Sequence, residues 1–466
     1  MARPAVFPGP VPVAQDVPVT SSPPPPGEPP HTEHAHVWSN WAGNQSCRVP
    51  VVRPTAEAEL QRVVADAASA GRHLKAVGSG HSFTGVALTD GLLVALEDYG
   101  RIRSVDRDAC TVTVEAGCRL RELSAALWTR GLALPNLGDI DVQTVAGATA
   151  TATHGTGLAF GNLSSAVVGL RLVDGTGAVL DCDADHHPEV FRAARAGLGA
   201  LGLVSTFTLQ CVPAFQLHAV HEPRPVDEVL ESFDELVASH DHFEFFWVPG
   251  TRWALTKTHR RNHEPVAPRS RKDAFVADVL LDNVGFGLAN RAGAVRPSWF
   301  KEVAKRLPAA GRVEFNDRSY RVFATPRHVR FVESEWAVPV EATVEVFGRV
   351  REVASSLGHP VTFPVEVRVS AADDITLSTA SGRTTGWVSV HMYRGMPHEE
   401  YFAKVADVMA DYDARPHWGK LHPRTAAELA PLYPGWDEFQ EVRARLDPHG
   451  TFENPELRRV LGPVGG

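Results

Sequence analysis

Short apolar runs alternate with amphipathic segments along the first half of the chain. The runs that predict β-strands are Val49–Val52, Leu74–Val77, Gly91–Leu96, Thr111–Glu115 and Val167–Val173. A helix is predicted from Thr55, whose side chain can cap it, to Gly71, and a second helix from Leu120 to Arg130. Strands and helices in alternation predict an α+β domain.

The pattern changes after Pro213, where the glycine-rich loops end and aromatic and histidine residues become more frequent. Before it, Val179–Leu180 completes a predicted hairpin, and the stretch Gly197–Ser205 enters a strand that ends near Val212. The elements predicted beyond it are a polar loop at Arg260–Asp273, strands at Val361–Ser370 and Trp387–Tyr393, and a helix around Phe439–Leu446. We therefore expect a first domain over residues 37–213 and a second over 214–466.

The composition narrows the class of protein. Residues 1–36 are dominated by proline, which predicts a disordered tail. The chain has 466 residues, 44% hydrophobic residues and a net charge of -9 without a Lys/Arg-rich block, which disfavours nucleic-acid binding. Its five cysteines lack C-x-x-C spacing, so we expect reduced thiols in a cytoplasmic protein and no metal site. Neither a membrane span nor a signal peptide is indicated, and membrane association is not expected.

Two glycine-containing loops could hold a large anionic ligand. The first, Ala76–Phe83, carries Gly78 and Gly80 before His81, and the second is His154–Gly157. Glycine lets a ligand approach the backbone, and successive amides in a turn form an anion-binding concavity. A third glycine at the head of a helix is missing, which makes a nicotinamide-dependent Rossmann dehydrogenase a weak alternative. Threonines and small residues crowd Leu137–Gly157, which favours a ligand-lining segment over a tightly packed helix.

Candidate catalytic residues occur in the second half. Glu366 and Arg368 are two apart in a strand-like run, so they share one face. They form either a structural salt bridge or, on the polar face of a strand that we expect to be half-buried between valines, a site for a polyhydroxylated substrate. His391 and Tyr393 share a face of another strand, and packing is a credible alternative for Tyr393. Lys420 lies in a Trp-Gly-Lys sequence that no regular element requires.

These motifs together resemble the FAD-dependent oxidases and dehydrogenases of the vanillyl-alcohol-oxidase superfamily, in the sugar-1,4-lactone and alditol oxidase branch. The resemblance rests on Val77–Phe83, Gly138–Gly157, Glu366–Arg368 and Arg415–Lys420, followed by Tyr433-Pro434 and Leu446–Pro448. It implies a two-lobed PCMH-type FAD-binding domain followed by an α+β substrate (cap) domain, whose C-terminal segment returns to the flavin. It also implies that His81 bonds covalently to the flavin.

The resemblance also assigns roles to individual residues. The catalytic residues it implies are Glu366, Arg368, His391 and Lys420. The cofactor-binding residues it implies are Val77, Gly78, Ser79, Gly80, His81, Ser82, Gly138, Asp139, Thr144, Gly147, Thr149, Thr153, His154, Gly157, Gly202, Val204 and Lys420. Lys420 would lie near N1 of the flavin and stabilise its reduced form.

The implied reaction is oxidation of a secondary alcohol of an aldono-1,4-lactone by hydride transfer to FAD N5. The expected substrate is L-gulono-, L-galactono- or D-arabinono-1,4-lactone, as in ascorbate-type biosynthesis, with dioxygen or another molecule as electron acceptor. One alternative is an alditol oxidase for xylitol or sorbitol, which Tyr393 disfavours. A non-catalytic flavin-binding protein is a further alternative.

Overall fold

The structure is a computed structural model that describes residues 35–269, 311–325, 327 and 329–465. Residues 1–34 of the predicted tail therefore lie outside it. The first strand, β1, spans Ala35–Ser39, so regular structure begins within the last two residues of the predicted tail. The described residues belong to one compact unit.

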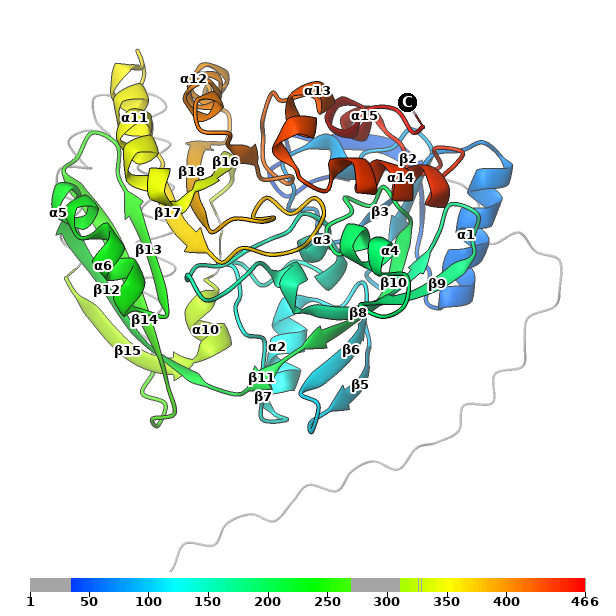
Figure 1. The fold of residues 1–466 in the computed structure, drawn as a ribbon, viewed down its shortest axis with the longest axis horizontal. Coiled ribbons are helices and arrows are strands. Elements are labelled where there is room, and N and C mark those ends of the chain that lie inside the picture. The colour runs from blue at the N-terminus through cyan, green and yellow to red at the C-terminus, as the bar shows by residue number, and fades with distance from the viewer. Residues whose placement is uncertain (1–34, 270–310, 326, 328, 466) are drawn as a thin grey trace, which may run out of the picture. The chain divides into compact units, whose positions relative to one another are not determined.

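Two sheets and a short strand pair form the first half of the described chain (Figure 1). The first sheet has the order β1-β2-β4-β3, with β2 (Ser46–Val52), β3 (Leu74–Val77) and β4 (Leu92–Ala95) parallel to one another. The second is antiparallel with the order β5-β6-β10-β8-β9, built from β5 (Ile102–Asp106), β6 (Thr111–Glu115), β8 (Val167–Val173), β9 (Val179–Asp183) and β10 (Leu203–Gln210). The pair is β7 (Leu132–Ala133) and β11 (Val212–Pro213).

Four α-helices and two 3-10 turns connect these strands. They are α1 (Glu57–Ser69), η1 (Gly85–Ala87), α2 (Leu120–Trp128), α3 (Val145–Ala150), η2 (Leu163–Ala166) and α4 (Pro188–Ala194). Helix α3 begins where the hydroxyl of Thr144 accepts a hydrogen bond from the Gly147 amide. The alternation of strands and helices predicted for this half is confirmed, including the hairpin of β8 and β9.

An eight-stranded antiparallel sheet dominates the second half, with the order β15-β12-β14-β13-β17-β18-β16-β19. Its strands are β12 (Gln216–Pro225), β13 (His242–Trp247), β14 (Trp253–Asn262), β15 (Val313–Arg318), β16 (Phe331–Pro339), β17 (Val365–Ser370), β18 (Thr385–Tyr393) and β19 (Arg415–Pro416). Short helices α5 (Val226–Glu231), α6 (Phe233–Ser239) and α10 (Ser319–Phe323) and the turn η5 (Val340–Ala342) join them, together with the longer helices α11 (Thr343–Ser356) and α12 (Glu399–Ala410).

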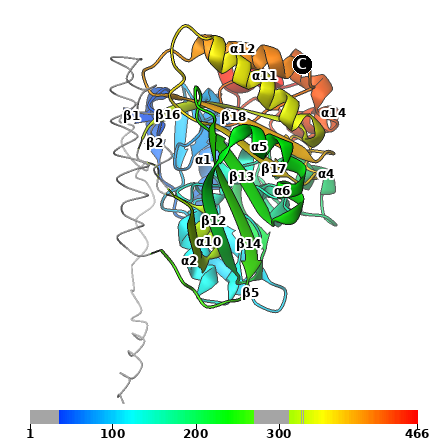
Figure 2. The same ribbon diagram turned by 90° about the vertical axis from the view of Figure 1, so that its left-hand side faces the viewer.

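One face of this sheet is covered by helices α5, α6, α11 and α12 (Figure 2). Apolar side chains at alternate positions pack against them, among them Phe243, Phe245 and Trp247 of β13 and Val365 and Val367 of β17. Because side chains alternate across a strand, the residues between these positions must face the other side. That side is the one that carries the polar residues described below.

The C-terminal helices pack on the first half of the chain rather than on the large sheet. They are α13 (Ala426–Leu429), η6 (Ala430–Leu432), α14 (Trp436–Leu446) and α15 (Pro455–Leu461). Phe439 and Leu457 share a hydrophobic core with Leu60 of α1 and Leu74 of β3, and α14 lies close to α4 (Figure 1). The predicted helix around residues 439–446 is thereby confirmed and extended to Trp436.

Three details of the sequence interpretation were wrong. The N-cap of α1 is Ala56 rather than Thr55, because the Thr55 amide and hydroxyl both donate to the Glu59 carboxylate. The predicted loop from Arg260 begins later, since β14 runs to Asn262; its residues from 270 onward lie outside the described part. Strand β17 was expected to be half-buried, yet all six of its residues are buried, because it lies between β13 and β18.

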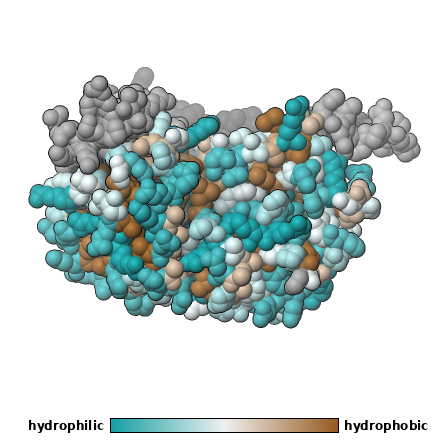
Figure 3. All heavy atoms as spheres, turned by 90° about the horizontal axis from the view of Figure 1, so that it is seen from above, coloured by the Kyte–Doolittle hydropathy of each residue, from teal (hydrophilic) through white to brown (hydrophobic). Residues whose placement is uncertain are grey.

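The surface is of mixed polarity. Hydrophobic residues are scattered among hydrophilic ones on the described part of the face in Figure 3. Among the described helices, none is both long and apolar enough to cross a bilayer. All five cysteines are free thiols, and Cys118, Cys182 and Cys211 are buried.

Candidate active site

A polar cavity lies against the uncovered face of the large sheet, and we call it the sheet cavity. Strands β16, β17 and β18 contribute Glu333, Glu335, Glu366, Arg368 and His391 to its wall. These positions face the cavity because apolar residues next to them, among them Val332, Val367 and Val390, belong to the core under the helices on the other face. The cavity encloses about 1040 Å³, its open mouth included. A strand period of two therefore accounts for five charged or titratable side chains meeting at one place.

A second cavity of about 1170 Å³, mouth included, surrounds the first glycine loop, and we call it the loop cavity. Its wall includes the loop Val77–Ser82, helix α3 and the segment Gly197–Val204. Among the described residues, the backbone amides of residues 79–82 have no hydrogen-bond partner. Free amides of successive turn residues are the donors that an anion needs.

The two cavities adjoin. His81, Ser82, Gln143 and Thr151 line both. A single elongated ligand could therefore lie with an anionic part in the loop cavity and a second part in the sheet cavity.

The structure gathers nearly all of the predicted site residues around these two cavities. The loop cavity is lined by Val77, Gly78, Ser79, Gly80, His81, Ser82, Thr144, Gly147, Thr149, Gly202 and Val204. The sheet cavity is lined by His81, Ser82, Gly138, Asp139, Thr153, His154, Glu366, Arg368, His391 and Lys420. Gly157 lines neither, because its amide donates to the carbonyl of Val369 and its backbone lies against Asp241 and His242. The other predicted positions are thus compatible with ligand contact, and their roles stay predictions.

The threonine-rich segment Leu137–Gly157 was interpreted as ligand-lining, with a tightly packed helix as the alternative. The structure shows features of both. Residues 145–150 form helix α3, in which Val145, Ala148 and Thr149 are buried. The same helix contributes Ala146, Gly147, Thr149 and Ala150 to the wall of the loop cavity. It is therefore a packed helix with one face toward the cavity.

Gly78 brings the glycine loop against the cap of α3. A Cβ at this position would lie deep inside van der Waals contact with Thr144 Oγ1, which caps the helix. We expect Gly78→Ala to weaken FAD binding by at least about tenfold, which corresponds to the ~1.4 kcal/mol that a modest backbone shift can cost. Fluorescence titration of the protein with FAD measures this. Gly348→Ala on α11, outside both cavities, is the control, because its Cβ would meet no atom within 4 Å and its φ, like that of Gly78, is not positive; an equal loss in both variants would contradict the expectation.

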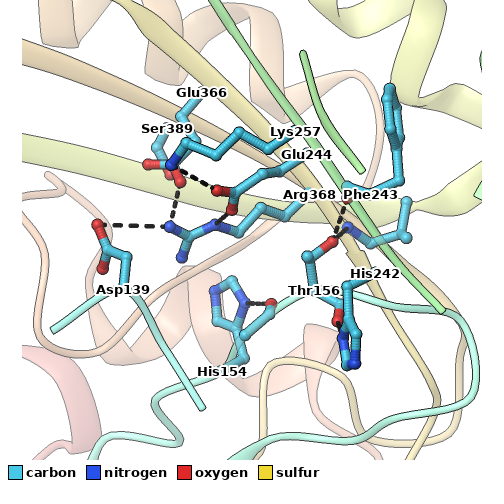
Figure 4. Close-up of polar contacts among 12 residues, drawn as sticks. Asp139, His154, Thr156, His242, Phe243, Glu244, Lys257, Glu366, Arg368 and Ser389 are labelled. Carbon is cyan, nitrogen blue, oxygen red and sulfur yellow. Dashed lines mark hydrogen bonds and ion pairs between the residues drawn. The ribbon is translucent and has the colours of Figure 1, made fainter. Parts of the chain in front are cut away.

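Arg368 lies at the centre of a buried network of charges (Figure 4). Its guanidinium makes an ion pair with Glu366, a hydrogen bond of 2.9 Å to Glu244, and lies 3.5 Å from Asp139. Only 7% of its side chain is exposed. Glu244 also accepts a hydrogen bond of 2.9 Å from Lys257. The network thus holds Arg368 by carboxylates from β13, β17 and the segment after β7, which fixes the direction of its fork.

The pKa of Glu366 is shifted in the opposite direction from that of the nearby carboxylate Glu244. Burial, together with the charges of Asp139 and Glu244, raises the pKa of Glu366 to about 7, although Arg368 acts in the opposite direction. Burial also raises the pKa of Glu244, but Lys257 and Arg368 outweigh it and bring it to about 2. Of these two carboxylates, Glu366 is the one that can gain or lose a proton near neutral pH.

His391 has a defined tautomer. Its Nδ1 lies 3.0 Å from the carbonyl oxygen of Pro364, which can only accept, so Nδ1 carries a proton. Its Nε2 lies 3.5 Å from Glu333 and 3.9 Å from Glu366. Burial lowers the pKa of His391, but these carboxylates outweigh it and leave the pKa above its usual value. Nε2 is therefore the atom of His391 that can exchange a proton inside the sheet cavity.

Lys420 enters the cavity from the segment after β19. Its ammonium makes an ion pair with Glu333 and lies 4.0 Å from Glu335. Burial lowers the pKa of Lys420, but these carboxylates outweigh it, so that the pKa lies above its usual value. Lys420 therefore carries a positive charge at the junction of the two cavities, close enough to act on His81.

His81 stands at that junction as a neutral imidazole. Burial and the charge of Lys420 lower the pKa of His81 to about 4. Its ring stacks on Trp41 at 5.3 Å between centroids, and among the described residues neither ring nitrogen has a hydrogen-bond partner. A ring nitrogen is thus available to a ligand that spans both cavities.

The sequence interpretation missed several members of the site. Glu333 and Glu335 are two apart on β16, which is the same signal that identified Glu366 and Arg368, and it could have found them. On β13, Glu244 lies among aromatic residues, and Phe243, Phe245 and Trp247 belong to the hydrophobic core. Such a run is more typical of packing than of a polar site. Arg327, which pairs with Asp139, lies in a segment without regular structure and gives no signal.

His154, Glu335 and His417 form a buried cluster whose potential ligand atoms lie within 4.8 Å of one another. Its hydrogen bonds are satisfied without a metal. His154 Nε2 lies 3.2 Å from Glu335, which also accepts from Ser389 at 2.6 Å. The Gly419 amide donates to His417 Nδ1, so that Nε2 of His417 carries the proton in the neutral ring and has no lone pair for an ion. The cluster is better suited to hold the wall of the cavity together than to bind a metal.

Comparison with known proteins gave three findings. Residues 207–460 match the family model for D-arabinono-1,4-lactone oxidase, and residues 50–183 match that for an FAD binding domain. The chain is 46% identical to L-gulono-1,4-lactone dehydrogenase of Mycobacterium tuberculosis over 92% of this chain and 99% of that one, and 32% identical to L-gulonolactone oxidase of Mus musculus over 91% and 98%. The structure of cholesterol oxidase from B. sterolicum has the same fold, with a TM-score of 0.77 over 96% of this chain and 100% of that chain, at 18% identity.

Proposed function

The chain belongs to the D-arabinono-1,4-lactone oxidase family, and from this premise we propose that it is an FAD-dependent oxidoreductase that oxidises a secondary alcohol of an aldono-1,4-lactone. The observation that carries the proposal is the meeting of the two cavities at His81. One offers free backbone amides to a pyrophosphate, and the other offers buried charged groups to a hydroxylated substrate. The FAD-binding domain would span residues 37–213 and the substrate domain 214–466.

FAD fits the residues of the loop cavity. The amides of residues 79–82 are unpaired donors among the described residues, and a Cβ at Gly78 would meet Thr144. Val77–Ser82, Thr144, Gly147, Thr149, Gly202 and Val204 would hold the cofactor there, and Asp139, Thr153, His154 and Lys420 would do so at the sheet cavity. When bound, FAD supplies a hydride acceptor for the alcohol carbon of the substrate.

The residues of the sheet cavity would bind and deprotonate the alcohol. Arg368, fixed by its carboxylates, donates hydrogen bonds to the substrate oxygen. His391 Nε2 accepts the hydroxyl proton, and Glu366 balances the imidazolium that results. As the C–H bond loses its hydride, the O–H bond loses its proton and the carbon–oxygen bond becomes a carbonyl. Lys420 provides the fixed positive charge near the cofactor.

We propose in addition that FAD is attached covalently through His81. The neutral, unpaired imidazole at the junction of the cavities supports this, because a neutral ring nitrogen is the nucleophilic form. An ascorbate-type pathway and a cytoplasmic location, in keeping with five free thiols, complete the proposal. Dioxygen or another molecule would be the electron acceptor.

The test is anaerobic reduction of the bound flavin by a substrate panel. L-gulono-, L-galactono- and D-arabinono-1,4-lactone are mixed with the holoenzyme in a stopped-flow instrument, beside xylitol and sorbitol. We expect at least one lactone to bleach the flavin at least about 100-fold faster than either polyol, because a pocket of fixed donors discriminates by ~2.7 kcal/mol or more. Faster reduction by the polyols would favour an alditol oxidase, and no reduction by any compound would favour a flavin-binding protein.

Tyr393 contributes little to the choice between these substrates. It does not line the sheet cavity; its ring stacks on Phe363, which does. The aromatic residues that line the sheet cavity, besides its histidines, are Trp41, Phe83, Phe246, Phe331 and Phe363. They bound the cavity with rigid rings, which suits a compact lactone ring better than an extended polyol.

A further inference from the structure

Glu333 has two partners, one for each of its carboxylate oxygens. Its Oε1 lies 3.5 Å from His391 Nε2, and its Oε2 makes an ion pair with Lys420 Nζ. Only 6% of its side chain is exposed, so bulk water screens these contacts less than it would at the surface. The carboxylate thus lies between the group that exchanges a proton and the group that carries the fixed charge.

Glu335, two residues further along β16, faces the same cavity but contacts other residues. It accepts a hydrogen bond of 2.6 Å from Ser389 and lies 3.2 Å from His154 Nε2, while Lys420 is 4.0 Å away. The charged groups that act most strongly on His391 are Glu333 from β16, Glu366 from β17 and Lys420 from the segment after β19. Of the two carboxylates of β16, only Glu333 touches both His391 and Lys420.

We propose that Glu333 is a positioning residue that couples His391, on the substrate side of the cavity, to Lys420, on the cofactor side. The names of these two sides rest on the proposed function, whereas the coupling rests on the contacts alone. Glu333 keeps its negative charge throughout. It stabilises the imidazolium that forms when His391 Nε2 takes up a proton, and it holds the ammonium of Lys420 in place.

The coupling predicts what happens when the charge of Glu333 is removed in Glu333→Gln. His391 loses the nearer of its two carboxylates, so its pKa falls, by about one unit or more for a buried pair at this distance. Lys420 loses its ion-pair partner, so its positive charge is neutralised less, and the reduction potential of bound FAD rises. Glu335→Gln, which removes a carboxylate two residues away on the same strand, leaves the His391 titration unchanged.

Both predictions are tested on the holoenzyme without any substrate. Histidine-labelled protein is titrated by NMR, the His391 signal being assigned by its loss in His391→Gln, and the potential of the flavin is measured by dye equilibration. We expect a lower His391 pKa and a higher potential in Glu333→Gln, and an unmoved His391 pKa in Glu335→Gln. An unchanged His391 pKa in Glu333→Gln, or an equal change in both variants, overturns the coupling.

Glu333→Asp keeps the test decisive if Glu333→Gln fails to fold. The shorter side chain retains the charge but cannot reach both partners, so either the His391 pKa or the flavin potential must move; if neither does, the coupling is wrong. Because no substrate is used, a failure of this inference leaves the lactone oxidation intact. Conversely, a failure of every lactone to reduce the flavin leaves the titration result standing.

Discussion

Replacing Arg368 with lysine is expected to slow anaerobic flavin reduction by the lactone about 10²- to 10³-fold while FAD stays bound. The planar fork of Arg368 contacts Glu244 and Glu366 at once and lies 3.5 Å from Asp139. A lysine ammonium keeps the charge, which prevents the carboxylates from being left uncompensated, but it cannot make the same set of directed bonds. Stopped-flow reduction with the holoenzyme measures the rate, and the flavin spectrum measures occupancy.

Two further variants make this result interpretable. Arg368→Ala removes the charge as well, and it is expected to lower the free energy of unfolding by about 3–5 kcal/mol, because the buried Glu244 and Glu366 and the partly buried Asp139 then lack their shared partner. Arg349→Lys on α11, whose guanidinium pairs with Asp411 at the surface, is the control and should leave the rate unchanged. Near-normal reduction in Arg368→Lys would remove Arg368 from the catalytic residues.

Replacing His81 with alanine is expected to convert a covalently bound flavin into a dissociable one. His81 lines both cavities, its pKa is lowered to about 4, and its ring nitrogens are free of partners among the described residues. After acid precipitation, the wild-type pellet should stay yellow and the His81→Ala pellet should be colourless. The variant still has the glycine loop, so it should bind FAD reversibly.

His73→Ala is the matched control for this experiment. His73 lies in the same half of the chain, outside both cavities, and its ring contacts Asp90 at the surface. Its pellet should stay yellow. A colourless wild-type pellet would show that no covalent bond forms, and a yellow His81→Ala pellet would place the bond at another residue.

The sequence predicted the local parts of the site better than their assembly. A strand period of two was enough to place Glu366 and Arg368 on one face, and glycine spacing was enough to identify the loop before His81. The order of strands β13-β17-β18-β16 could not be predicted, because it departs from the order of the strands in the sequence and pairs β13 with β17, more than a hundred residues away. That order is what brings Glu244 to Arg368 and Glu333 to His391.

The local sequence pattern also could not predict that the charged network around Arg368 is buried. In the sequence, Glu366 and Arg368 are typical of a solvated or half-buried face. In the structure, the first half of the chain closes over that face, and residues such as Asp139 and His154 become part of the same cavity. The raised pKa of Glu366 follows from this closure and not from its sequence neighbours.

The docking of the C-terminal helices on the first half of the chain has a consequence for biosynthesis. Lys420 and His417 are delivered to the cavity by a segment anchored through Tyr433 and Phe439 in the core that also contains Leu74. A ribosome makes the glycine loop long before these anchors, so a nascent chain exposes the loop before the charge that faces it can arrive. The flavin should therefore be retained firmly only after the segment that carries Lys420 has been made and has docked.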